Sequence, residues 1–218
     1  MTSMEKVSDG TDCLIQLNNL KVLLPISYLG PTSYYSILLQ SSEVFVESKE
    51  HFVKQSIRNR CSILSSNGTQ ILSIPKERKS AHKTIIKDIN ISKTQNWQKL
   101  HWQALNSSYN PSPFFEYYKD QLEEFYHNNA YNLFDFNLRL TELILSFLQT
   151  EKKIHLTSEY QRQFEGIDFR NHKFKNLELE PYEQVFSEKL EFQSDLSVLD
   201  LLFNLGPETS SYLERQSI

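Results

Sequence analysis

Short apolar runs separated by polar turns mark strand-length segments in the first half of the chain. These runs are Leu20–Leu24, Val44–Val46, Ser62–Leu64 and Gln70–Ile74. Gly30-Pro31 marks a turn after the first run. Thr32 or Ser33 can then cap a helix that continues to Leu39. A strand, a helix and a second strand in this order predict a parallel pair of strands.

Three further patterns add to the predicted sheet. Asn67-Gly68 lies between two apolar runs, and this dipeptide is a strong signal for a β-hairpin. The alternating segment Ile85–Ile91 predicts another strand. The segment Lys153–Thr157 predicts a strand that returns to the sheet after a group of helices.

From Asn96 onward the apolar period changes from two to about 3.6 residues, which predicts helices. Asn96 can cap the first helix, whose apolar stripe consists of Trp97, Leu100, His101, Ala104 and Leu105. Ser112-Pro113 opens the second helix, whose apolar face consists of Phe114, Tyr117, Tyr118, Leu122 and Phe125. The third stripe consists of Leu133, Phe136, Leu140, Leu143, Ile144 and Phe147. Ser197 has capping-box spacing to Asp200, and Gly206-Pro207 stops the short helix that follows.

These elements predict an α/β fold, with a mixed, partly parallel sheet covered by helices and a helix-rich C-terminal half. The length of 218 residues fits one domain with a sizeable core. We expect a flexible leader at residues 1–18, a single domain at 19–207 and a frayed tail at 208–218.

Composition narrows the cellular setting. No apolar run approaches the ~20 residues that a membrane span needs, so we expect no membrane span. The polar first dozen residues do not resemble a secretory signal. Cys13 and Cys61 are too few for a disulfide framework, and the expected compartment is the reducing cytoplasm.

Charge is distributed unevenly along the chain. Residues 43–102 contain eleven Lys and Arg against five Asp and Glu, a balance of +6. Residues 103–218 contain ten against nineteen, a balance of −9. A local basic region beside an acidic half favours a small anionic ligand, because the acidic half would repel a nucleic acid.

The polar stretch Glu47–Arg60, between two predicted strands, is the principal candidate for a site. It is either a solvated connection or an anion-binding surface. Its hydrogen-bond donors are Lys54, Gln55, Arg58, Asn59 and Arg60. Guanidinium and ammonium groups form short charge-assisted bonds with phosphate or carboxylate oxygens. The basic loop at residues 76–83 is likewise either solvated or a lid over an anionic ligand.

Candidate acid and base groups are few. Glu47, Glu50 and His51 lie near the cations, where a carboxyl group favours a base or positioning role. His101 lies one turn from Trp97, and both a structural pairing and a site role stay open. The sequence has no metal-ligand spacing, no Gly-x-Ser-x-Gly elbow and no Gly-x-Gly-x-x-Gly loop, and we predict no cofactor.

Five segments in this order resemble the WbqC-like family over residues 20–207. They are Pro25–Tyr35 with Tyr28, Gly30, Tyr34 and Tyr35; Lys54 to Asn59-Arg60; Asn67-Gly68 before a strand that ends at Pro75; Asn96-Trp97 with His101 and Tyr109; and Leu196–Asn204. Two features depart from the family pattern. Leu24 precedes Pro25 where many members have Met-Gln-Pro, and Ser48-Lys49 stands where many have Asp-Asp.

The resemblance implies a bacterial, cytoplasmic protein of surface-polysaccharide biosynthesis. A transferase is the implied activity, moving an acyl or aminoacyl group to a nucleotide-linked amino sugar. The implied catalytic residues are Glu47 and His101. The implied substrate-binding residues are Tyr28, Lys54, Gln55, Arg58, Asn59, Arg60, Asn96 and Trp97.

Architecture predicts where such a ligand binds. Ligands of open α/β sheets lie beyond the carboxyl ends of the strands, where Pro25–Ser33 and Glu47–Arg60 would meet. The alternative function is a non-catalytic interaction protein, in which a basic face docks on an acidic helical face of a partner or of a second copy.

Overall fold

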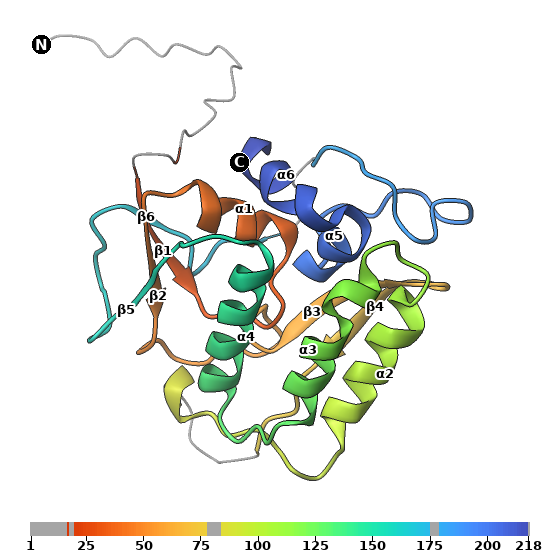
Figure 1. Cartoon of the computed structure of the whole chain (residues 1–218). Coiled ribbons are helices and arrows are strands. Elements are labelled where there is room, and N and C mark those ends of the chain that lie inside the picture. Colours follow the sequence, from red (N-terminus) through yellow and green to blue (C-terminus); the bar gives the residue numbers. More distant parts are fainter. Residues whose placement is uncertain (1–16, 18–19, 78–83, 175–178, 218) are drawn as a thin grey trace, which may run out of the picture.

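Two β-layers and the helices around them form the α/β fold that the sequence predicts (Figure 1). The computed structural model describes residues 17, 20–77, 84–174 and 179–217. The predicted leader therefore lies outside the described residues, except for the buried Leu17. Residues 78–83 of the predicted basic loop also lie outside the described residues. None of the helices among the described residues has the length and apolar composition needed to cross a bilayer.

The larger layer is a parallel sheet of four strands in the order β5-β2-β1-β6. The strands are β1 (Lys21–Pro25), β2 (Glu43–Glu47), β5 (Ile154–Leu156) and β6 (Ile167–Asp168). The predicted parallel pair is confirmed, with Leu23 opposite Phe45. The returning strand is also confirmed, because β5 pairs with β2. The sequence did not predict β6, since a two-residue strand has no detectable period.

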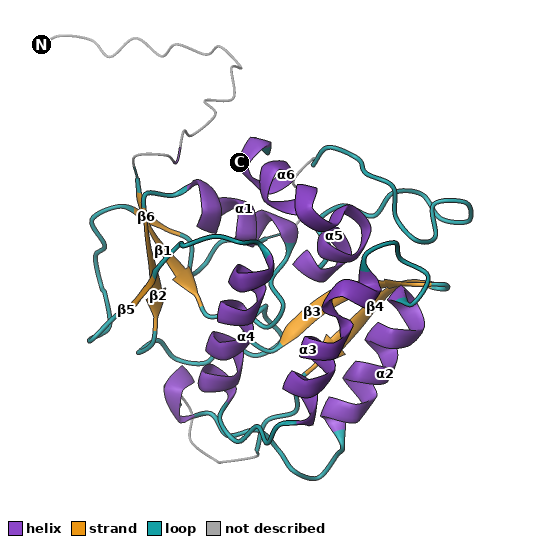
Figure 2. Ribbon diagram, viewed as in Figure 1, coloured by secondary structure: helices purple, strands orange, loops and turns teal. Residues whose placement is uncertain are grey.

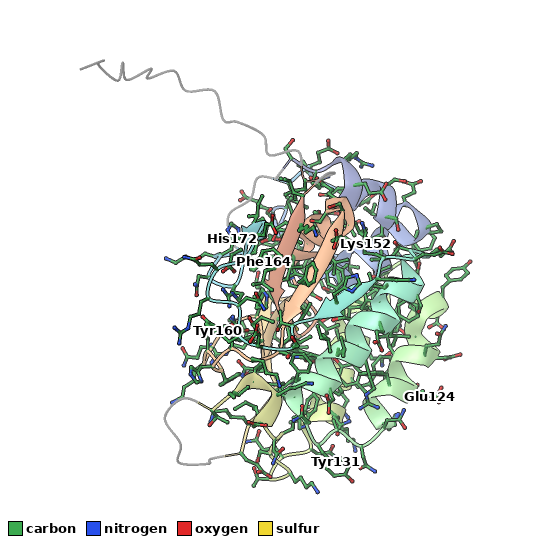
Figure 3. The ribbon with its side chains drawn as sticks, turned by 90° about the vertical axis from the view of Figure 1, so that its left-hand side faces the viewer. Glu124, Tyr131, Lys152, Tyr160, Phe164 and His172 are labelled. Carbon is green, nitrogen blue, oxygen red and sulfur yellow. The ribbon has the colours of Figure 1, made fainter. Side chains whose placement is uncertain are left out.

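The sheet is covered differently on its two sides. Helices α1 (Thr32–Gln40) and α4 (Leu133–Phe147) lie on one side (Figure 1). Val44 and Val46 are fully buried and, by the alternation of a strand, lie on the face opposite to Phe45. On the other side the ring of Phe164 packs edge-on against Phe45, with centroids 5.5 Å apart (Figure 3). Helices therefore bury one face of the sheet, whereas the other face is only partly covered, since Phe45 and Phe164 are half-buried and His155 is exposed.

The smaller layer is the predicted hairpin, formed by β3 (Arg60–Ser65) and β4 (Gly68–Ser73) (Figure 2). Gly68 adopts a φ of 101°, a conformation that glycine tolerates without a steric penalty. Cys61 and Ile63 are buried on the side of α2 (Trp97–Tyr109), whereas Arg60 and Ser62 alternate with them on the other side.

The strand predicted over residues 85–91 is wrong. This segment contains the 3₁₀ turn η2 (Ile86–Asp88), flanked by isolated bridges to His51, Lys76 and Asn132. Ile86 and Ile89 are both buried. Because residues three apart share one side of a 3₁₀ turn, this apolar spacing fits a turn as well as a strand.

Three further helices follow the predicted periods: α2, α3 (Phe115–His127) and α5 (Val198–Leu205). A last helix, α6 (Thr209–Arg215), was not predicted. Leu100 and Tyr117, predicted as apolar-face residues, are 58% and 76% exposed. Each stands about 200° around its helix from a buried aromatic residue two positions away, Trp102 or Phe115, which decides the buried side.

The predicted helix caps are confirmed in one of four places. The Ser197 hydroxyl accepts a hydrogen bond from the Leu199 N–H, as expected for an N-cap. Asn96 precedes α2, but its side chain makes no capping bond. Pro31 occupies the N-cap position of α1, so Thr32 and Ser33 lie inside the helix. The second predicted cap, Ser112-Pro113, lies before α3, whose N-cap position is taken by Phe114.

The frayed tail predicted after Pro207 is wrong for the described residues. The turn η3 (Gly206–Glu208) leads directly into α6, on which Tyr212 and Leu213 are buried. The Gln40 amide donates to the carbonyls of Leu213 and Gln216, each at 2.9 Å. Two adjacent apolar residues give no period, so only the packing against α1 reveals this helix.

Gly206 permits the sharp turn between α5 and α6. Its φ is 54°, and an added Cβ would meet the ring of Phe114. We expect Gly206→Ala to lower the free energy of unfolding by about 2–4 kcal/mol, from backbone strain and overpacking together. Urea denaturation measures this change. Gly68→Ala is the control, because its Cβ meets open space and only the strain of about 1–2 kcal/mol applies. Equal losses of unfolding free energy in the two variants would contradict the expected clash between the added Cβ and the ring of Phe114.

Candidate functional site

A cavity of about 670 Å³ lies where the two β-layers meet. Its wall includes Pro25 at the carboxyl end of β1, Pro31 before α1, Arg60 and Ile71 of the hairpin, and Ser197 before α5. The volume is typical of small-molecule sites, which span roughly 300–1,000 Å³. The position beyond the ends of parallel strands is the one that open α/β sheets use for ligands.

Backbone hydrogen bonds join the wall segments. Ser197 N–H donates to the carbonyl of Ser62 at 2.8 Å, which ties the segment before α5 to the hairpin. Tyr28 N–H donates to the carbonyl of Ile57 at 2.8 Å, which ties the segment after β1 to the turn before β3. The cavity is therefore shaped by main-chain contacts between parts far apart in sequence.

Arg58 lines the cavity, but an acidic partner already occupies its guanidinium. Its Nε and Nη2 donate to the two carboxyl oxygens of Glu50 at 2.6 and 2.5 Å. Nη2 also donates to the carbonyl of Arg170 at 3.1 Å. Burial raises the pKa of Glu50, and the hydrogen bonds and charge of Arg58 oppose that rise.

Arg170, which follows β6, is held by two carboxyl groups. Its Nη1 donates to Glu47 at 3.0 Å, and its Nη2 donates to Asp168 at 2.6 Å. Partial burial raises the pKa of Asp168, but the bonds from Arg170 lower it overall. The aromatic face of Tyr160 covers the guanidinium at 4.8 Å. We call Glu47, Glu50, Arg58, Asp168 and Arg170 the ion network.

Glu47 lies inside the ion network and does not line the cavity. The side chain is fully buried, and Thr157 Oγ1 and the Gln161 N–H donate to it at 2.6 and 3.1 Å. The Lys49 N–H donates at 2.9 Å. With the bond from Arg170, both carboxyl oxygens have partners, so Glu47 has little capacity left for a ligand.

Two cations of the cavity wall have no acidic partner among the described residues, Arg60 and Lys173. The Nε of Arg60 is buried without a hydrogen-bond partner in the described part of the chain. A buried donor without a partner is costly, and an anionic ligand would satisfy it. These two residues are the cations free to contact a ligand.

The predicted substrate-binding residues of the Glu47–Arg60 stretch separate in the structure. Gln55, Arg58 and Arg60 line the cavity. Lys54 is exposed and does not line it. Asn59 is buried, and its amide donates to the carbonyl of Ile74 at 3.2 Å. The turns before β3 therefore send neighbouring polar residues to different surroundings.

Tyr28 and His101 form a second, buried cluster behind the hairpin. The Tyr28 hydroxyl lies 2.7 Å from His101 Nδ1 and 2.6 Å from the Tyr126 hydroxyl. Trp97 contacts the imidazole edge-on, with centroids 5.2 Å apart. Neither Tyr28, His101 nor Trp97 lines the 670 Å³ cavity. Asn96 and Trp97 instead border a smaller hollow of about 310 Å³ at the start of α2.

Burial lowers the pKa of His101 from its usual 6.5 to about 4, although a hydrogen bond to the Ser73 backbone raises it. The ring is therefore neutral at neutral pH. Nδ1 of the ring shares a hydrogen bond with the Tyr28 hydroxyl, and that hydroxyl shares a second hydrogen bond with the Tyr126 hydroxyl. These bonds join the segment after β1 to α2 and α3.

The sequence reasoning missed four wall residues: Asp195, Arg170, His172 and Lys173. All lie in irregular segments without an apolar period. The run Arg170 to Lys173, with three basic or imidazole side chains in four positions, was a signal that could have drawn attention. Asp195 gave no signal, because only the fold brings it to Ser33 at the start of α1.

Within the described ranges, no group of three or more His, Cys, Asp or Glu side chains could hold a metal ion. Cys61 borders the cavity, but burial raises the pKa of its thiol, so a reactive thiolate does not form near neutral pH.

The Arg58–Glu50 pair tests the structural role of the ion network. Arg58→Met removes the partner of a buried carboxyl group, and we expect the free energy of unfolding to fall by about 3–5 kcal/mol. Urea denaturation measures the loss. Arg162→Met changes an exposed arginine in the same way and should cost less than about 0.5 kcal/mol. A similar small loss for both variants would show that the pair contributes little.

The lowered pKa of His101 predicts a pH dependence of stability. Between pH 6.5 and 4 the unfolded chain binds a proton at this ring and the folded chain does not. Stability from this group is therefore complete above pH 6.5 and falls as the pH approaches 4, by up to about 3 kcal/mol. His101→Gln should lose this part of the pH dependence, measured by urea denaturation at pH 7 and 4.5. An unchanged pH profile in the variant would contradict the assignment.

Comparison with known proteins gives the chain's relationships. The model of the WbqC-like protein family matches residues 27–169, which run from the segment after β1 through β6. A protein of Mycobacterium tuberculosis (strain ATCC 25618 / H37Rv), described as uncharacterized protein Rv1507c, is 26% identical over 221 residues, covering 86% of this chain and 94% of that protein. No solved structure matches. Because the family model covers well over half of the sequence, the chain belongs to the WbqC-like protein family.

Proposed function

We propose that the cavity binds the phosphate part of a small molecule, and that the protein is a transferase of bacterial surface-polysaccharide biosynthesis. The substrate we propose is a nucleotide-linked amino sugar that receives an acyl or aminoacyl group in the cytoplasm. The family relationship supports the setting. The cavity supports an anionic ligand of small size, and the buried, unpartnered Nε of Arg60 is the observation that carries this proposal.

Charge matching supports a diphosphate. Three carboxyl groups already surround Arg58 and Arg170 within the ion network. Arg60 and Lys173 remain, and their two positive charges match the two negative charges of the diphosphate in a sugar nucleotide. A longer polyanion would meet the ion network without gaining further free cations. The geometry therefore favours one sugar nucleotide over a nucleic acid.

The rest of the wall suits the neutral parts of such a ligand. Ile71 is 60% exposed at the cavity and offers an apolar surface for a ring. Gln55, Ser62 and Thr69 offer polar groups for hydroxyls or a base edge. The mixture of a few polar groups and an apolar surface is typical of small-molecule sites.

The roles predicted for Glu47, His101, Tyr28, Asn96 and Trp97 stay predictions. A ligand in the cavity would touch none of these side chains, because none of them borders it. In the proposal, Glu47 positions Arg170, and the Tyr28–His101 cluster supports the hairpin from behind.

Calorimetry with UDP-glucosamine and UDP-N-acetylglucosamine tests the proposal. We expect at least one of the two sugar nucleotides to bind the parent protein. Arg60→Ala should bind it at least tenfold more weakly, a loss of about 1.4 kcal/mol of binding free energy, because a charge-assisted hydrogen bond is lost. Lys153→Ala changes an exposed cation away from the cavity and should bind within about twofold of the parent.

Two results would contradict the proposal. One is the absence of heat with either sugar nucleotide. The other is equal binding by the Arg60→Ala and Lys153→Ala variants. Salt-sensitive self-association in the absence of ligand binding would instead favour the alternative interaction protein.

A further inference from the structure

Asp195, which precedes α5, is the only one of the described residues that brings a carboxyl group into the wall of the 670 Å³ cavity. The carboxyl groups of the ion network do not line this cavity. The same wall contains Arg60 and Lys173, the cations that have no acidic partner in the described part of the chain. The cavity therefore presents charges of both signs, which suits a ligand that carries a cation as well as an anion.

The segment that carries Asp195 is bound to the strand that carries Arg60. Ser197, two residues after Asp195, donates its N–H to the carbonyl of Ser62 on β3 at 2.8 Å. Arg60 lies two residues before Ser62 on the same strand, so these two side chains lie on the same face of the hairpin. All four residues line the cavity. The carboxyl group and the free guanidinium group therefore belong to adjoining parts of one wall.

The Asp195 carboxylate is held in place and still has acceptor sites left. Its Oδ1 accepts from the Ser33 N–H at 2.8 Å, and its Oδ2 accepts from the Ser33 hydroxyl at 2.9 Å. A carboxylate offers about four lone-pair sites, so Ser33 fills about half of them. Glu47 differs, because four donors surround its two oxygens. Asp195 therefore has the capacity for a ligand that Glu47 lacks.

No cation of the described residues forms an ion pair with Asp195. The residue is half-buried, and burial raises the pKa of its carboxyl group, whereas the bonds from Ser33 and the charge of His172 lower that pKa. A half-buried carboxylate without a cation in contact loses hydration that is only partly replaced. A positively charged group of a ligand in the cavity would supply the missing partner.

We propose that Asp195 is the specificity-determining residue of the cavity and that it binds the protonated amine of the sugar. This inference rests on the proposed function and narrows the substrate to a sugar nucleotide whose amine is free. The diphosphate contacts Arg60 and Lys173, and the ammonium group donates to the acceptor sites that Ser33 leaves open on Asp195. A sugar with a hydroxyl or an acetylated amine at this position has no positive charge and leaves the carboxylate without a cation.

Calorimetry of the parent protein with three sugar nucleotides tests this preference, at a pH at which the sugar amine is protonated. UDP-glucosamine should bind at least about tenfold more tightly than UDP-glucose and UDP-N-acetylglucosamine, because only its amine carries a charge. Equal binding of the three would overturn the inference and leave the proposed binding of sugar nucleotides standing. If none of the three binds, the proposed function and this inference both fail.

The variant Asp195→Asn tests the residue itself. Asparagine still accepts from the Ser33 N–H and tolerates the φ of 56° at this position, but it removes the charge. The affinity for UDP-glucosamine should fall about tenfold, whereas that for UDP-glucose should stay within about twofold of the parent. Arg60→Ala should weaken both ligands by the same factor, because both contain the diphosphate. Asp120→Asn, an exposed aspartate of α3, is the matched control and should change neither affinity.

Two results with Asp195→Asn would overturn the role of this residue. One is an undiminished preference for UDP-glucosamine over UDP-glucose. The other is an equal loss of both ligands, as in Arg60→Ala, which would make Asp195 a support of the wall rather than the partner of an amine. Urea denaturation checks that the variant is folded. Asp195→Gly, in which glycine adopts the positive φ without strain, is the replacement if it is not, and the same two results decide.

Discussion

The guanidinium of Arg170 is the centre on which the arrangement of this site depends. The guanidinium donates to Glu47 at the end of β2 and to Asp168 at the end of β6. The backbone carbonyl of Arg170 accepts a hydrogen bond from Arg58. A buried carboxyl or guanidinium group without a partner is strongly unfavourable. Each member of the ion network is therefore tolerated inside only because the others are present, and this requirement fixes the strand ends and the turn before β3 relative to one another.

The same requirement limits what the cavity can bind. Charges that satisfy each other inside the protein are not available to a ligand, and with three carboxyl groups against two guanidinium groups the ion network offers no surplus positive charge. Arg58 and Arg170 look basic in the sequence but act as parts of the fold. Arg60 and Lys173 have no acidic partner among the described residues and are therefore the cations of the cavity wall that can bind a negatively charged ligand.

A second polar network joins α2, α5 and the hairpin. Asp200 of α5 is buried and accepts from Tyr109 at 2.8 Å and from Gln184 at 3.0 Å. Tyr109 also accepts from the Leu64 N–H of β3 at 3.1 Å, so α2, α5 and the hairpin are joined at one point. Satisfied buried networks of this kind favour a single packing arrangement. This network therefore holds the hairpin and α5, whose neighbouring residues Ser62 and Ser197 line the cavity.

The sequence alone determined the elements with a clear period or a local signal. Val44–Val46, the Asn67-Gly68 hairpin and the α4 stripe are examples, because their residues report burial directly through spacing. It did not determine β6, α6 or the loss of the strand at 85–91, because short segments have no period and take their conformation from what they pack against. For the site, the sequence indicated a basic stretch but could not tell which cations remain free. Pairing depends on distances between residues such as Glu47 and Arg170, or Ser33 and Asp195, and only the tertiary structure sets those distances.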